Sequence, residues 1–263
     1  FFFADQNKST DGGTTWGVYR REGNHGRPQI PILPVHTKTE GWSALEGLLE
    51  HELVHHEQYN NWGSYHWGSD SAPKSSQDLL NDMGWEWDKT ARKNLLLDKD
   101  GHRWQKAKSG WTRADGTGDK LTNSQMRDIA KVKPATDYFT APGEMHAEGL
   151  AMLRQNREKL YKESKGMYDL AKKWDQDLIN RKWPIDKDGN TRYIRGADGA
   201  IVRNNKENRE AVKKAEEKWQ KEIEEKTGKT SMSLDQFPKA EQFVFEDNYR
   251  RFRCGTEAEI GRI

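Results

Sequence analysis

The chain has 263 residues, a length that suits one large domain or two small ones. Charged residues make up 33% of it, and 44 basic against 42 acidic side chains give no electrostatic footprint for binding nucleic acid or an anionic membrane. No apolar run approaches the roughly 20 residues of a membrane-spanning helix, and 11 tryptophans argue against disorder because large rings supply buried area.

The ends of the chain and its single thiol give three expectations. The first residue is Phe rather than Met, so we expect a fragment of a longer protein, and Phe1–Phe3 is too short an apolar stretch for a secretory signal. The single cysteine, Cys254, excludes an intrachain disulfide and fits a protein that works in or passes through a reducing compartment. We expect this thiol to be buried and structural.

Residues 1–40 are predicted to form strands and turns. Apolar residues gather at 16–19 and 30–35, and the prolines of the second stretch confine it to a sheet edge or an extended segment. Residues 5–11 alternate oxygen-bearing side chains as calcium loops do, but they lack the glycine required at the sixth position. We therefore predict a polar loop there.

One continuous helix is predicted over residues 41–60, and it carries His51-Glu52-Leu-Val-His55. Residues four apart lie on one helix face, so both imidazoles can reach a single ion, with Glu52 beside water on that ion. Two neutral nitrogen ligands and a carboxylate base are what a zinc peptidase needs. The alternative interpretation is a histidine-rich surface helix in a charged protein.

Residues 61–121 are rich in Gly, Ser, Trp and Asp, with helical turns predicted at 76–82 and 88–97. The same four residues, Asp-Lys-Asp-Gly, occur at 98–101 and 186–189 and are hairpin-turn signals. We predict turns rather than calcium sites, because neither continues into a full ligand series. The second lies before strand-like stretches at 191–195 and 200–203.

The remainder is predicted to be mainly helical. Pro142 marks the start of a helix over 141–163. Apolar residues at helical spacing predict two further packed helices, around 167–178 and 212–223, and a last helix covers 238–252.

A catalytic zinc needs a third protein ligand and leaves its fourth position to water. Metzincins are excluded because Gln58 and Asn61 stand where that group has glycine and histidine. The helix at 141–163 opens with Gly143-Glu144-Met-His-Ala-Glu148, whose two glutamates share a face. One carboxylate can bind zinc while the other accepts the ring N–H of a ligand histidine. Glu144 could instead favour the positive end of its helix.

The two motifs together resemble the zinc domain of anthrax lethal factor and related bacterial toxin peptidases, and more loosely the thermolysin-type gluzincins. The resemblance implies that Glu144 is the third zinc ligand beside His51 and His55. It also implies that Glu148 holds a ligand histidine and that Tyr138 stabilises the oxyanion.

The expected fold is α+β and predominantly helical, a zincin-like fold with a small N-terminal sheet, the helix that carries the motif and a helical C-terminal part. It forms a single catalytic domain over 1–263, with lobes at about 1–135 and 136–263 and a hairpin insertion at about 184–203.

Several other side chains stay open as participants. Tyr59 lies one turn after His55, on the same helix face, and could donate to the oxyanion in place of Tyr138. Three further histidines are alternative ligands or donors: His36, His66 and His102. We expect His146 to pack in the core and His56 to point elsewhere on its helix.

These features predict a zinc-dependent metalloendopeptidase that acts on a protein or peptide, in which Glu52 takes a proton from the attacking water and delivers it to the leaving amine. The stretch at 30–35 could bind the substrate by strand addition. The resemblance implies a bacterial toxin or effector module that is secreted or delivered into a target cell, with a cognate immunity protein as a partner. The alternatives are a non-catalytic zinc-stabilised interaction module, charged helices whose histidines bind nothing, and an amide hydrolase of cell-wall peptides.

Overall fold

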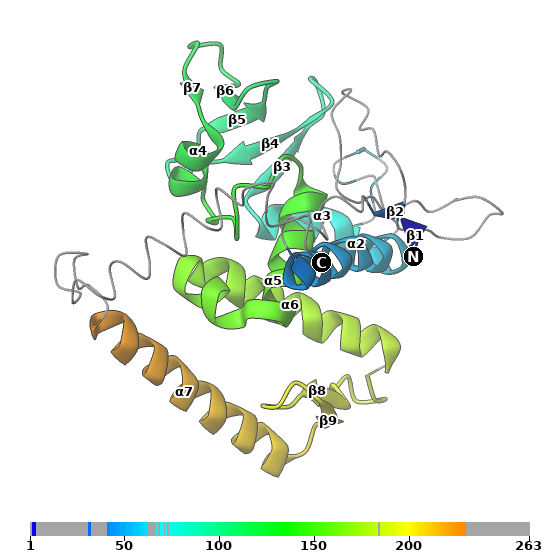
Figure 1. Cartoon of the computed structure of the whole chain (residues 1–263). Helices are drawn as coiled ribbons and strands as arrows, with labels where there is room; N and C mark the ends of the chain where they lie inside the picture. Colours follow the sequence, from blue (N-terminus) through cyan, green and yellow to red (C-terminus); the bar gives the residue numbers. More distant parts are fainter. Residues whose placement is uncertain are drawn as a thin grey trace. The chain divides into compact units, whose positions relative to one another are not determined.

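The protein is described from a computed structural model (Figure 1). The structure describes residues 2–3, 31–32, 41–62, 67, 69–70, 72, 74–183 and 185–229. Helices account for about 54% of these residues, so the predicted α+β class with a helical majority is confirmed. The chain divides into two compact units, Phe1–Asn205 and Lys206–Ile263. The predicted zincin-like fold and single catalytic domain stay predictions.

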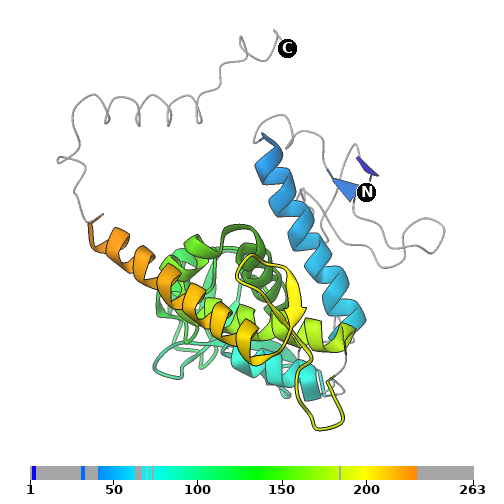
Figure 2. The ribbon, with the colours of Figure 1, turned by 90° about the horizontal axis from the view of Figure 1, so that it is seen from below.

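The first unit contains three long helices: α2 (Gly41–Trp62), α5 (Pro142–Glu163) and α6 (Lys165–Lys182). α2 is one uninterrupted helix (Figure 2), which confirms the helix predicted over 41–60. α5 packs against both α2 and α6. Glycines permit the close approach, since a Cβ at Gly149 would lie 2.8 Å from Sδ of Met167 on α6.

A five-stranded antiparallel sheet follows the first helices in the order β3-β4-β5-β6-β7. Its strands are β3 (Trp85–Asp88), β4 (Lys93–Leu97), β5 (Arg103–Lys106), β6 (Trp111–Arg113) and β7 (Lys120–Leu121). Trp85 pairs with Leu96 and Leu96 with Trp104, and all three side chains are buried. Trp111 stacks on Phe139 with ring centroids 5.3 Å apart. The core of this part is therefore built largely from tryptophan.

Two short helices flank this sheet, α3 (Lys74–Asp82) and α4 (Asn123–Ile129). α3 confirms the helical turns predicted at 76–82. The helical turn predicted at 88–97 is wrong, because these residues form the end of β3, a turn and β4. The apolar run Leu95–Leu97 fits a helix as well as a strand, and it forms a strand because it pairs with β3 on one side and β5 on the other.

Two smaller pairs complete the described strands. β1 (Phe2–Phe3) pairs in parallel with β2 (Pro31–Ile32), which lies in the stretch predicted as an edge strand. β8 (Tyr193–Arg195) and β9 (Ile201–Arg203) form the antiparallel hairpin that was predicted. The sequence predicted a small N-terminal sheet before the motif helix. The largest sheet among the described residues instead follows α2 in the chain.

The Asp-Lys-Asp-Gly segments are turns, as predicted. The Asp98 carboxylate accepts hydrogen bonds from the backbone N–H groups of Asp100 and His102, from the His102 ring and from Trp104 Nε1 at 2.9 Å. Asp186 accepts from the backbone of Asp188 and Asn190 in the same way. Asp98, Asp100 and His102 lie close enough to hold an ion, but the Asp98 oxygens are already used as acceptors within the turn.

The second unit is described through α7 (Lys206–Lys229), which confirms the helix predicted around 212–223. Lysine and glutamate four residues apart form ion pairs along it, as at Lys213–Glu217 and Lys221–Glu225. None of the described helices is long and apolar enough to cross a membrane.

Several predictions concern residues outside the described part of the chain. They are the strand at 16–19, the polar loop at 5–11, the alternative ligands His36 and His66, the thiol of Cys254 and the helix at 238–252.

Candidate metal centre

The two histidines of the motif lie side by side on α2. Because α2 is unbroken, residues 51 and 55 are one turn apart on one face, and their ring centroids are 4.7 Å apart. His51 is 6% exposed and Val54 between them is fully buried, so this face of the helix is held against the rest of the fold. A histidine-rich surface helix would expose both rings, and that alternative is wrong for His51.

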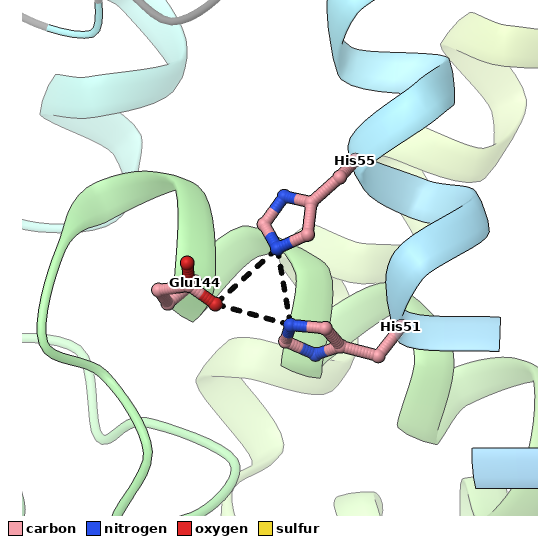
Figure 3. A group of neighbouring side chains, drawn as sticks. All are labelled: His51, His55 and Glu144. Atoms are coloured by element: carbon pink, nitrogen blue, oxygen red, sulfur yellow. Dashed lines mark hydrogen bonds and ion pairs between the residues drawn. The ribbon is translucent and has the colours of Figure 1, made fainter. Parts of the chain in front are cut away.

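The first turn of α5 brings a carboxylate to this pair (Figure 3). Oε2 of Glu144 lies 3.0 Å from Nε2 of His51 and 3.3 Å from Nε2 of His55. The two Nε2 atoms are 3.1 Å apart. Three potential ligand atoms from segments 89 residues or more apart in sequence therefore converge on one point.

The triangle of donor atoms has the dimensions of a tetrahedral zinc site. Zinc lies about 2.0–2.1 Å from nitrogen or carboxylate oxygen, which sets tetrahedral ligand atoms about 3.3 Å apart. The observed separations of 3.0, 3.1 and 3.3 Å agree with that edge length. Two imidazole nitrogens and one carboxylate oxygen also form a ligand set that suits zinc and leaves one position open. These residues can hold a metal ion.

Each histidine has a side-chain oxygen close to its Nδ1 atom. Nδ1 of His51 lies 2.8 Å from Oε1 of Glu148, one turn after Glu144 on α5. Nδ1 of His55 lies 2.9 Å from Oε1 of Gln58. Such partners place the proton on Nδ1 and leave the Nε2 lone pair for a metal. Glu148, the glutamate predicted to hold a ligand histidine, therefore lies next to His51, and its role stays a prediction.

The carboxylates control the charge of this cluster. Burial lowers the pKa of His51, but hydrogen bonds to Glu144 and Glu148 outweigh it and raise that pKa to about 10. Burial acts in the same sense on His55, whose pKa is nevertheless raised by Glu144, with Glu52 also contributing. The two histidines in turn lower the pKa of Glu144 against the effect of its burial. Protons therefore occupy the cluster in the absence of metal, and a bound cation has to displace them.

The proposed base and the two tyrosines occupy different places around the triangle. Glu52 is 5% exposed and follows His51 on α2. Tyr138 is 52% exposed, and its ring centroid lies 5.8 Å from that of His51. Tyr59 lies in the wall of a cavity that also borders His55. Both tyrosines are therefore near the cluster, and the more exposed one is Tyr138.

The cavity beside the cluster has a volume of about 180 Å³. Its wall includes His55 and Glu144 together with the side chains of Tyr59, Trp67 and Pro142. The polar residues Gln58 and Asn94 also line it. A recess of this size beside two potential ligands can accept one side chain or a similar small group next to a bound ion.

The remaining histidines are placed as follows. His146 is fully buried, with ring centroids 4.5 Å from Trp174 and 5.4 Å from Trp67, so it packs as predicted. Burial lowers its pKa to about 3, and it is therefore neutral. The His56 ring contacts Asn60 on another face of α2. His102 belongs to the Asp98 turn and takes no part in the cluster.

Two residues of the site were missed in the sequence. Gln58 received attention only as a departure from the metzincin pattern, although its position three residues after His55 places it beside that ring. Thr136 donates to Oε2 of Glu148 at 2.6 Å and accepts from the backbone N–H of Tyr138 at 3.1 Å. It thereby connects the carboxylate behind His51 to the segment that carries the tyrosine, a link that no local pattern predicts.

Comparison of the chain with protein-family models, with curated proteins and with solved structures finds no match. The resemblance to the lethal factor-like peptidases therefore stays a prediction, and inferences about function rest on the residues of the site.

Proposed function

We propose that the protein is a zinc-dependent hydrolase that cleaves peptide bonds. The observation that supports this most strongly is the triangle of His51, His55 and Glu144, whose ligand atoms lie 3.0–3.3 Å apart. A second is the position of Glu52, a buried carboxylate that directly follows His51 on α2, where a general base beside the metal would have to lie.

Zinc bound here supplies Lewis-acid chemistry, since it lowers the pKa of water and polarises a carbonyl group. In this proposal His51, His55 and Glu144 hold the ion, and Glu148 and Gln58 orient the rings. Glu52 removes a proton from the attacking water and delivers it to the nitrogen of the leaving amine. Tyr138 donates its hydroxyl proton in a hydrogen bond to the carbonyl oxygen as negative charge develops there.

The surroundings of the site favour a peptide as the substrate. The 180 Å³ cavity next to His55 and Glu144 offers a recess for one side chain beside the scissile bond. The exposed ring of Tyr138 borders solvent, where a chain can approach. The resemblance to lethal factor-like peptidases extends the proposal to a bacterial effector or toxin module that is secreted or delivered into a target cell and inhibited by an immunity protein.

The test is turnover by Glu52→Gln in zinc-loaded protein. A mixture of unfolded proteins is incubated with each variant, and new peptide termini are identified by mass spectrometry. We expect the wild type to cleave, and Glu52→Gln to bind zinc normally but to lose a factor of about 10²–10⁴ in rate, the usual contribution of a general base. Glu158→Gln, at a half-buried position of α5 where the side chain pairs with Lys162, is the matched control and should behave as wild type.

Two results would contradict the proposal. A zinc-loaded wild type that cleaves nothing would favour the non-catalytic module. Near-normal turnover by Glu52→Gln would show that another group acts as the base. If the protein released amines only from cell-wall peptides, the proposed zinc-dependent amide hydrolysis would stand, but the substrate would be cell-wall peptide rather than protein.

A further inference from the structure

Gln58 is a buried amide that joins one ligand histidine to the segment of the third ligand. It is 4% exposed and lies on α2 three residues after His55. Its Oε1 accepts from Nδ1 of His55 at 2.9 Å. Its Nε2 donates to the Gly143 carbonyl at 2.8 Å and faces Nδ1 of His146 at 2.9 Å. Both ends of the amide are therefore engaged.

The hydrogen-bond partners of Gln58 determine which end of its amide faces His55 and which faces Gly143. A carbonyl oxygen can only accept, so the NH2 end of Gln58 must face Gly143. The oxygen end then faces Nδ1 of His55, and that nitrogen has to carry the proton. The lone pair of His55 is left on Nε2, the atom that lies 3.3 Å from Oε2 of Glu144. The opposite tautomer would set two donors or two acceptors against each other.

The same amide also fixes the distance between two helices at the site. Gly143 directly precedes Glu144 in the first turn of α5, and His146 follows two residues later. The bonds from Gln58 therefore hold this turn against α2 within one residue of the third ligand. Trp67 and Trp174 pack on the His146 ring and limit its movement, so the amide has a rigid support.

We infer that Gln58 is the positioning residue of the centre: it fixes His55 with Nε2 toward the ion and holds the Glu144 turn in register with α2. This inference rests on the proposed metal site and adds a residue to it. The two histidines then have different partners at Nδ1: the Glu148 carboxylate for His51 and the neutral Gln58 amide for His55. The loss of a partner of this kind typically weakens metal binding by about 10–100-fold.

Zinc alone is the probe, and its affinity is measured by competition with a chromogenic chelator. Gln58→Met keeps the length of the side chain and removes the amide, and we expect affinity to fall by about 10–100-fold. Gln58→Glu keeps an oxygen facing His55 but loses the donors to Gly143, so its affinity should lie between those of wild type and Gln58→Met. Gln176→Met is the control, because Gln176 on α6 donates hydrogen bonds to Asn180 on the same helix and to the Tyr193 carbonyl of β8, and it is not among the residues of the centre.

The visible spectrum of the Co²⁺-loaded proteins gives a second readout. We expect the bands of Gln58→Met to shift because the His55 ring is free to rotate, while those of Gln176→Met stay in place. Circular dichroism checks that each variant is folded. If Gln58→Met unfolds, Gln58→Glu decides: an affinity within about tenfold of wild type supports the inference, and a larger loss contradicts it.

The outcomes separate this inference from the proposed function. Zinc binding by wild type that is unchanged in Gln58→Met, or equally weak in Gln58→Glu and Gln58→Met, overturns the role of Gln58 alone. A wild type that binds no zinc overturns the proposed metal centre, and the role of Gln58 with it.

Discussion

Arg154 on α5 connects α2, the helix that carries His51 and His55 of the candidate metal centre, to the rest of the first unit. Its guanidinium forms ion pairs with Glu50 at 2.8 Å and Glu57 at 2.9 Å, both on α2, and lies 3.6 Å from Asp175 on α6. Asp175 in turn binds Arg195 of the β8–β9 hairpin. Burial lowers the pKa of Arg154, but Glu57 and Glu50 outweigh this effect and raise the pKa above its ordinary value, so the side chain stays charged.

We expect Arg154→Met to lower the free energy of unfolding by about 3 kcal/mol, at the lower end of the 3–5 kcal/mol typical of breaking a buried ion pair. The lower end applies because the side chains of Glu50 and Glu57 are 25% and 33% exposed and can turn toward water. In addition, Asp175 keeps its bonds to Arg195. For a chain of this size the loss corresponds to a decrease of about 6–12 °C in melting temperature.

The assay is urea denaturation of metal-free protein, followed by circular dichroism, so that zinc binding does not mask the loss. Lys173→Met is the control, because the Lys173–Asp82 pair joins α6 and α3 with a 58% exposed lysine, and exposed pairs contribute about 0–1 kcal/mol. A loss below about 1 kcal/mol for Arg154→Met, or one equal to that of the control, would refute the view that Arg154 holds the helices together.

Three further predictions address the site and the sheet. Glu148→Ala should weaken zinc binding by about 10–100-fold in a chelator competition, and unchanged affinity would show that this carboxylate does not orient His51. Tyr138→Phe should lower kcat by about 10²–10³ with KM unchanged; if Tyr59→Phe produces that loss instead, the oxyanion donor has been misassigned. Burial raises the pKa of Asp98, but hydrogen bonds from Trp104 and the backbone outweigh it and lower that pKa. The Asp98 carboxylate therefore contributes to stability above about pH 4, and this contribution is lost as the pH falls through the lowered pKa. The difference in unfolding free energy between wild type and Asp98→Asn should therefore shrink below about pH 4, and a difference independent of pH would contradict this.

Local periodicity was sufficient to predict which residues of the site lie on the same face of a helix. A 3.6-residue repeat places residues 51 and 55 on one face, and the same repeat places Glu144 and Glu148 on one face of α5. The convergence of the two helices was predicted from the paired glutamates of the second motif and from a resemblance, and the structure brings Oε2 of Glu144 to both rings. Whether these groups act as ligands stays a prediction.

The parts that were missed depend on contacts between distant segments. Leu95–Leu97 reads equally well as a helical turn, and only pairing with β3 and β5 makes it a strand. Thr136 acts through Glu148, twelve residues later in the chain. Gln58 could have been recognised from its spacing to His55, but its other partners lie 85 and 88 residues away. Nothing in the local sequence predicts such pairs.

The most direct test of the metal centre is elemental analysis of wild type and Glu144→Ala, both purified without added metal. About one zinc per chain in wild type, largely lost in Glu144→Ala, is the predicted result, because removal of one of three ligands abolishes stable binding. No zinc in wild type even after reloading, or full zinc in Glu144→Ala, would contradict the assignment of His51, His55 and Glu144 as a zinc site.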